Sequence, residues 1–217
     1  MAPDNYKSII STSRHTPDST YLPNDDRTIV AGFKKQKKII LDGLLTKHVG
    51  AGEVSLRPGI APGPALLSMK PLSRGYIEIA SSNPFEDPKI YYRTFSDPTD
   101  VKVVTQNIKY ARAFFESEGM SSFKPVETYP GKDVTSEKAL EEVARGRIVN
   151  PSVGHASCTC PMMDRDIGGV VDEELNVYGT KGLRVVDLSI MPIIPSNHLV
   201  STRYAIAEKA ADIIKGM

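Results

Sequence analysis

This 217-residue sequence contains few cysteines, no marked excess of positive or negative charge, and no long apolar runs. Its two cysteines, Cys158 and Cys160, are too few for a disulfide framework or for the four ligands of a zinc site, so no metal is expected. Lysine and arginine total 27 against 26 aspartates and glutamates, which argues against a broad nucleic-acid interface. No segment reaches the ~20 consecutive apolar residues of a membrane span.

The two ends of the sequence contain no targeting signal that we can identify. Residues 1–5 lack the positive start and apolar run of a signal peptide, and residues 215–217 match no peroxisomal or retention address. The basic cluster Lys34–Lys38 is short and is expected to be the solvated face of a helix. We therefore expect a soluble protein without membrane or nucleic-acid partners, of unknown location.

The first half of the sequence predicts a loose N-terminal arm followed by a mixture of helices and strands. Residues 1–30 are rich in serine, threonine, aspartate and proline and lack sustained periodicity, so we expect a polar, loosely ordered arm. An apolar and basic pattern predicts a helix across residues 29–49. Alternation and turn residues then predict strands at residues 65–71, 75–80 and 90–92.

The second half predicts three further helices. One begins after Asp97 or Thr99 and carries an apolar stripe; another covers residues 136–145; the last covers residues 200–215. The stripe of the first helix is Val101, Val104, Ile108, Ala111 and Phe115, and the inner face of the last is expected to be Tyr204, Ala207, Ala211 and Ile214. The fold class that follows is α+β, an antiparallel or mixed sheet covered by helices.

Two histidines are the candidate catalytic residues. His155 lies in a run of small side chains at residues 154–160, and His198 lies in a turn just before the last helix. Imidazole exchanges protons near neutral pH, and a helix N-terminus favours an electron-rich ligand. A histidine alone in a loop is more often structural or solvated than catalytic. For the turn that contains His198, the alternative is that Ser196 or Asn197 simply caps the last helix.

The order of motifs around these histidines resembles a known family. The run His155–Met162 is followed by Gly169–Asp172, Leu175–Gly179, Gly182–Pro192 and Ala207–Ala211. This arrangement resembles the C-terminal signature of the glucose–methanol–choline (GMC) family of FAD-dependent oxidoreductases. Upstream, the segments Pro71–Gly75, Asn83-Pro84 and Ser96–Asp100 resemble the substrate-binding portion of the same family. The resemblance covers roughly residues 65–217, and residues 30–64 more weakly.

The resemblance implies a division of the chain and a reaction. Residues 31–150 would form a substrate-binding-type domain, and residues 151–217 would carry the catalytic histidine and complete an FAD-binding domain. His155 would act as the general base that takes the hydroxyl proton of a small alcohol substrate, while hydride passes to flavin N5. His198 would hydrogen-bond the same oxygen.

The resemblance also implies where the cofactor lies. Asp187 and Leu188 would approach the ribityl–pyrophosphate region of FAD, and Leu199 and Val200 would lie near the pyrimidine edge of the flavin. Three positions depart from the usual family pattern: Cys158 and Met163 replace glycines, and Gly154 replaces an aromatic residue. The departures leave the proposed base in place and leave the choice of substrate open.

The Gly-x-Gly-x-x-Gly pattern of a dinucleotide-binding segment is not found in this sequence. Gly50-Ala51-Gly52 begins it, but Ser55 occupies the third glycine position and Pro58 follows. The N-terminal Rossmann part of the family is therefore expected to be absent, and a chain that carries the FAD-binding domain is a candidate partner. Two functions follow: part of an FAD-dependent alcohol oxidoreductase, or a truncated, non-catalytic interaction module without flavin.

Overall fold

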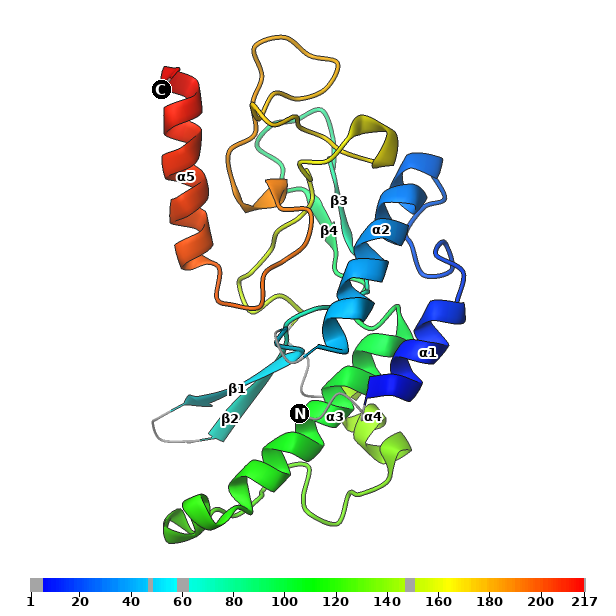
Figure 1. Cartoon of the computed structure of the whole chain (residues 1–217), viewed down its shortest axis with the longest axis vertical. Coiled ribbons are helices and arrows are strands. Elements are labelled where there is room, and N and C mark those ends of the chain that lie inside the picture. Colours follow the sequence, from blue (N-terminus) through cyan, green and yellow to red (C-terminus); the bar gives the residue numbers. More distant parts are fainter. Residues whose placement is uncertain (1–5, 47–48, 58–62, 147–150, 217) are drawn as a thin grey trace.

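The computed structural model of the chain describes residues 6–46, 49–57, 63–146 and 151–216 (Figure 1). The α-helices and 3-10 helices (η) are α1 (Lys7–His15), α2 (Arg27–Leu44), α3 (Pro98–Phe115), η2 (Glu118–Phe123), α4 (Glu137–Gly146), η3 (Arg165–Ile167), η4 (Leu188–Ile190) and α5 (Val200–Lys215). The strands are β1 (Gly52–Arg57), β2 (Gly63–Ser68), β3 (Tyr76–Glu78) and β4 (Lys89–Tyr91). No helix within these described ranges is long and apolar enough to cross a membrane.

Helix α3 forms contacts with α1, α4, β1 and β2 and is the centre of one half of the molecule (Figure 1). Asp97 caps it by accepting a hydrogen bond from the Thr99 amide at 2.8 Å, as its sequence predicts. The stripe predicted for this helix is buried at Val101, Val104 and Ile108, and these side chains pack against Leu140 and Ala144 of α4.

The α+β class is confirmed, but the strands do not join into one sheet in the described part of the chain. β1 pairs with β2, and β3 pairs with β4, each antiparallel. The segment between the two pairs is held elsewhere, because the Leu72 and Ser73 amides donate hydrogen bonds to the Asp100 carboxylate, each at 2.7 Å. These amides are therefore not available to a neighbouring strand.

The expectation of a loose arm over residues 1–30 does not hold for its described part. Residues Lys7–His15 form α1, whose Ile9 and Ile10 are buried in a cluster with Leu41 and Leu44 of α2. Three side chains, Tyr6, Ile9 and Ile10, are enough to dock this segment, because α2, α3 and Leu72 supply the rest of the cluster.

The basic cluster in α2 is not solvated throughout. Lys37 is buried, and its ammonium donates a hydrogen bond to the Thr16 carbonyl at 2.8 Å and lies 3.3 Å from Asp18. Lys34 and Lys35 are exposed, as expected for a solvated face. Lys37 thus ties the segment after α1 to α2.

The bounds predicted for the last helix match α5, but its predicted inner face is wrong. Ala210 is buried and Ile206 and Ile213 are partly buried, against a cluster of Val171, Leu175 and Ile190. Tyr204 and Ile214, which were expected to face inward, are 63% and 57% exposed. The helix has two apolar stripes side by side, and only one of them is covered by the described residues of this chain.

Replacing Tyr6 by phenylalanine tests the packing of α1. Tyr6 is buried, its hydroxyl has no hydrogen-bond partner among the described residues, and burial raises its pKa to about 12. Between the ordinary value of 10 and about 12, the unfolded chain loses this proton and the folded chain keeps it, so stability falls as pH rises by about 1.4 kcal/mol per unit. We expect Tyr6→Phe to be neutral or slightly stabilising at pH 8 and to reduce the alkaline loss.

The measurement is urea unfolding of both proteins at pH 8 and pH 11. Tyr110→Phe, at an exposed position on α3, is the control and should lose stability between these pH values as the wild type does. An equal alkaline loss in Tyr6→Phe and in the wild type would contradict the prediction.

Candidate active site

The structure brings together the two histidines that the sequence singles out. Nδ1 of His198 lies 3.1 Å from Nε2 of His155, although the residues are 43 positions apart in the chain. Their ring centroids are 5.0 Å apart and the rings are tilted by 51°. His155 is half-buried and His198 is exposed, so the pair is accessible from solvent.

Hydrogen bonds position the two segments that carry the histidines. The His155 amide donates to the Ser152 carbonyl at 2.8 Å, and Nδ1 of its ring lies 2.8 Å from the Val153 carbonyl oxygen. On the other side, the Ser196 hydroxyl donates to the Gly50 carbonyl at 3.0 Å, which ties the turn before His198 to the approach to β1. The two histidine loops therefore meet at the base of the β1–β2 hairpin.

Glu53 completes the cluster, and the sequence reasoning missed it. Its Oε1 lies 3.1 Å from Nε2 of His198, across 145 residues of sequence. The alternation of residues 52–57 would have placed Glu53 on one face of a strand. Nothing in the sequence indicates that this face meets the turn before α5.

The contacts of the two rings determine how many protons the cluster holds. The Val153 carbonyl and the Glu53 carboxylate are acceptors, so Nδ1 of His155 and Nε2 of His198 are inferred to carry hydrogens. The contact between the two remaining nitrogens needs a third hydrogen. Two neutral imidazoles have only two, so the arrangement accommodates one additional proton, and the Glu53 carboxylate balances its charge.

The loop after His155 runs beside the segment expected to face the cofactor. The amides of Cys158, Cys160 and Met162 donate to the carbonyls of Leu188, Ser189 and Ile190 at 3.2, 2.9 and 2.7 Å. Leu188 is half-buried, and Asp187 is exposed and caps η4 through the Ser189 amide at 2.7 Å. These contacts bring Asp187 and Leu188 to the same side of the molecule as the histidine loop.

Cys158 adopts an unusual backbone conformation in this loop. Its φ is +68°, the left-handed region that favours glycine, which is the residue expected here from the family pattern. Burial raises the pKa of its thiol, and the nearby Arg74 and Lys70 only partly offset this. The thiol is therefore a neutral packing group at neutral pH.

The N-terminus of α5 lies directly after His198. Leu199 is buried and Val200 is 59% exposed, and no side chain caps the helix. The alternative that Ser196 or Asn197 serves as its cap is therefore wrong. The first amides of a helix have no intrahelical acceptor, so this end suits the electron-rich edge of a ligand.

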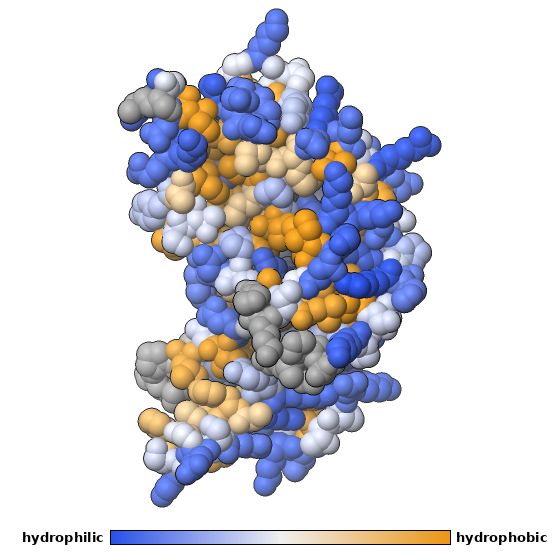
Figure 2. All heavy atoms as spheres, in the orientation of Figure 1, coloured by the Kyte–Doolittle hydropathy of each residue, from blue (hydrophilic) through white to orange (hydrophobic). Residues whose placement is uncertain are grey.

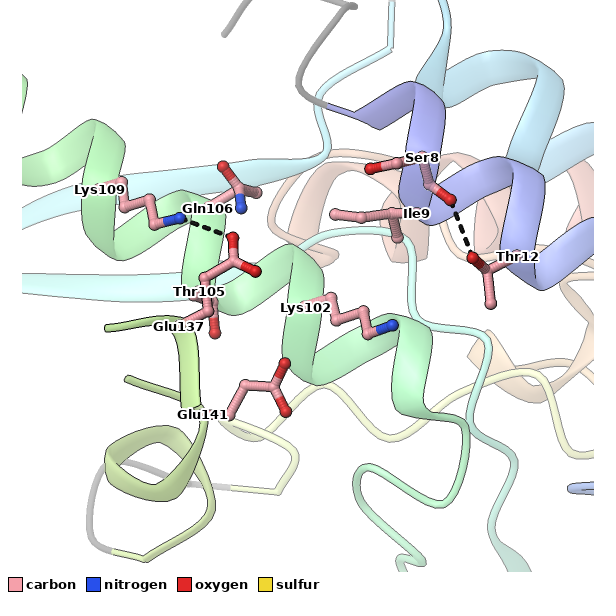
Figure 3. A pocket seen from close by; sticks show the side chains of 9 residues that line it. All are labelled: Ser8, Ile9, Thr12, Lys102, Thr105, Gln106, Lys109, Glu137 and Glu141. Carbon is pink, nitrogen blue, oxygen red and sulfur yellow. Dashed lines mark hydrogen bonds and ion pairs between the residues drawn. The ribbon is translucent and has the colours of Figure 1, made fainter. Parts of the chain in front are cut away.

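A separate groove of about 440 Å³ lies between α1, α3 and α4 (Figure 3). It is lined by charged side chains such as Lys102 and Glu141, and by an ion pair of 2.8 Å between Lys109 and Glu137. None of the site residues expected from the sequence lines this groove. Among the described residues, no group of three or more potential ligands could hold a metal ion, and the expectation of a metal-free site stays a prediction.

Comparison with known proteins supports the resemblance of this chain to the GMC family. The family described as GMC oxidoreductase matches residues 71–207. The dehydrogenase xptC of Emericella nidulans is 35% identical over 97% of this chain and 34% of its own length. The mitochondrial choline dehydrogenase of Mus musculus is 39% identical over 69% of this chain and 25% of its own length.

Solved structures show the same similarity in three dimensions. An FAD-dependent oxidoreductase from Chaetomium thermophilum has a TM-score of 0.92 and 38% identity, over 99% of this chain and 37% of its own chain. A fungal aryl-alcohol oxidase has a TM-score of 0.85 and 32% identity, over 98% of this chain and 36% of its own chain.

The chain thus spans about a third of the length of the first of these relatives and of both solved structures. His155 and His198 lie inside the residues matched by the family, and Glu53 lies outside them. The order of motifs, the family match and the shared fold agree: this chain belongs to the GMC oxidoreductase family.

Proposed function

We propose that the chain supplies the catalytic histidine part of an FAD-dependent oxidoreductase that acts on CH–OH groups. The observation that carries the proposal is the pair of facing imidazoles, 3.1 Å apart, in a chain of this family. Oxidation of an alcohol needs a proton acceptor at the hydroxyl and a hydride acceptor at the carbon. The histidine pair provides the first of these, and FAD, when bound, supplies the second.

In the proposed mechanism the two rings and Glu53 have different tasks. The hydroxyl of a small alcohol binds between the rings, replacing their mutual contact. Nε2 of His155 takes the hydroxyl proton, because its Nδ1 is already engaged by the Val153 carbonyl. His198 holds the same oxygen, and Glu53 fixes the orientation of His198 and balances the positive charge that the pair acquires.

The residues expected near FAD are compatible with it. The uncapped first turn of α5 at Leu199 and Val200 offers backbone N–H groups to the carbonyl-rich pyrimidine edge of a flavin. Asp187 and Leu188 lie beside the Cys158 loop, and we assign them to the ribityl–pyrophosphate region of FAD. Both assignments are proposals that rest on this placement and on the family.

We further propose that an FAD-binding segment of the GMC type packs on the exposed stripe of α5. The stripe consists of Val200, Tyr204, Ala207 and Ile214. Figure 2 shows apolar patches on the viewed face in the region where Figure 1 draws α5. Apolar surface of this kind is typical of a binding face. A non-catalytic interaction module would use the same face without flavin, and it is the second candidate.

A chimera separates these two functions. In the Chaetomium thermophilum FAD-dependent oxidoreductase, the portion that this chain matches is replaced by the 217 residues. We expect the chimera to purify with the visible absorption of flavin, and we expect this absorption to bleach when a small primary alcohol is added without oxygen. The 217-residue chain mixed with FAD alone serves as the comparison.

The outcomes are distinct. A folded chimera that binds flavin but is not bleached by any of a panel of aliphatic, aromatic and sugar alcohols would contradict the catalytic proposal. A folded chimera without flavin absorption would favour the interaction module.

A further inference from the structure

The β1–β2 hairpin has two faces, and the active-site cluster lies on only one of them. Side chains alternate along a strand, so Gly52 and Glu53 face opposite sides of β1. Glu53 faces His198, at 3.1 Å from Nε2. The Gly52 side faces α3, because a Cβ atom built on Gly52 would lie 2.1 Å from Nδ2 of Asn107.

The approach of Gly52 to Asn107 leaves no room for a side chain. The same Cβ atom would lie 2.5 Å from both Cγ and Oδ1 of Asn107, whereas ordinary contact begins at 3.4 Å. A methyl group here forces β1 and the Asn107 side chain apart by about 1 Å. The whole amide of Asn107 therefore lies directly under the backbone of β1.

Burial limits the movement of the Asn107 side chain. It is only 3% exposed, and α3 is fixed by the packing of Val104 and Ile108 against Leu140. Its Nδ2 has no hydrogen-bond partner among the described residues. An unpaired buried N–H costs about 1–3 kcal/mol, so this amide does not stabilise α3 through hydrogen bonding at Nδ2.

We propose that Gly52 and Asn107 are positioning residues, whose contact sets the height of β1 above α3 so that the Glu53 carboxylate reaches His198. A displacement of about 1 Å at this point moves Glu53 out of hydrogen-bond distance, since the contact is already at 3.1 Å. The consequence for turnover rests on the proposed function, but the contact itself does not.

The first test uses the 217-residue chain alone and needs no flavin. Long-range ¹H–¹⁵N NMR spectra of the histidine rings report which nitrogen of His198 carries its hydrogen. We expect Gly52→Ala to give the His198 spectrum of Glu53→Gln, in which the carboxylate is lost. The double variant Gly52→Ala/Asn107→Ala, which makes room for the methyl group, should return to the wild-type spectrum.

Gly119→Ala is the matched control, because a Cβ atom at Gly119 meets nothing within 4 Å. It should leave the spectrum unchanged. A wild-type spectrum for Gly52→Ala would overturn the proposal, and so would a folded double variant that keeps the altered spectrum. If Gly52→Ala does not fold, the double variant decides: a folded protein with the wild-type spectrum supports the proposal, and any other result overturns it.

The second test measures turnover in the chimera. Misplacement by 1 Å can cost on the order of 10²-fold in rate, so we expect Gly52→Ala to lower turnover by about 10-fold to 10²-fold. If Gly52 acts through Glu53, the same change in a Glu53→Gln background should have no further effect. A further loss of similar size in that background would show that the glycine does not act through Glu53. An inactive chimera would contradict the proposed function and leave the spectroscopic test standing.

Discussion

Replacing Asp100 by alanine should lower the free energy of unfolding by several kcal/mol. Asp100 is 4% exposed, and its two oxygens accept hydrogen bonds from the amides of Leu72 and Ser73, each at 2.7 Å. Alanine leaves both amides without an acceptor, and Leu72 is itself buried. Each buried N–H left unpaired costs about 1–3 kcal/mol, so the expected loss is about 2–6 kcal/mol.

The charge of Asp100 adds a pH dependence of known sign. Burial raises the pKa of its carboxyl above the ordinary value of 3.8, against the effect of the two amides. Ionisation of Asp100 therefore costs more free energy in the folded protein than in the unfolded chain. As a result, the wild type loses stability as pH rises from 3.8 to the raised pKa. The alanine variant lacks this contribution, and its deficit should be largest below that range and smaller at neutral pH.

Urea unfolding followed by circular dichroism, at pH values on both sides of this range, measures both effects. Asp87→Ala is the control, because Asp87 is exposed in a turn before β4 and should change the stability little. A loss in Asp100→Ala no greater than that in Asp87→Ala would contradict the role assigned to this carboxylate.

The role of Asp100 shows what the sequence predicts and what it does not. The cap at Asp97 and the apolar stripe of α3 are local patterns, and both are found as predicted. The hydrogen bonds that the Leu72 and Ser73 amides donate to Asp100 span 28 and 27 residues, and no local pattern indicates them. Of the four strands in the described part of the chain, β2, β3 and β4 were predicted and β1 was missed, and the separation of the strands into two pairs was not predicted.

The helix α1 at the start of the chain and the inner face of α5 at its end were not predicted, for a related reason. Residues 7–15 are polar overall, and they form a helix because α2 and α3 offer an apolar surface to Ile9 and Ile10. On α5, the sequence contains two adjacent apolar stripes, and periodicity alone cannot decide which one is covered. Packing against Val171 and Ile190 decides it.

The histidine pair was predicted through its family resemblance, whereas Glu53 was not. The motif around His155 and the turn before α5 are specific enough to name both histidines. Glu53 lies on a hairpin outside residues 71–207, and its place beside His198 depends on the tertiary packing of β1 on α3. We therefore expect residues that orient a catalytic group to be harder to find from sequence than the group itself.

Replacing His155 by alanine in the chimera should lower turnover by about 10²-fold to 10⁴-fold, the usual contribution of a general base. His155 is suited to this role because Nδ1 is engaged by Val153, which leaves Nε2 to accept the hydroxyl proton. Flavin absorption should be unchanged, because none of the residues assigned to FAD is altered. The measurement is the rate of flavin bleaching in single turnovers with excess alcohol, which reports the chemical step directly.

His15→Ala is the matched control for this change. His15 is exposed in the last turn of α1, and Nδ1 of its ring lies 2.7 Å from the Ser11 carbonyl oxygen of the same helix. The bleaching rate of this variant should equal that of the unmodified chimera. If His155→Ala bleaches as fast as His15→Ala, then His155 is not the base. If His155→Ala keeps a fast rate and His198→Ala loses it, the role of the base passes to His198, the other ring of the facing pair.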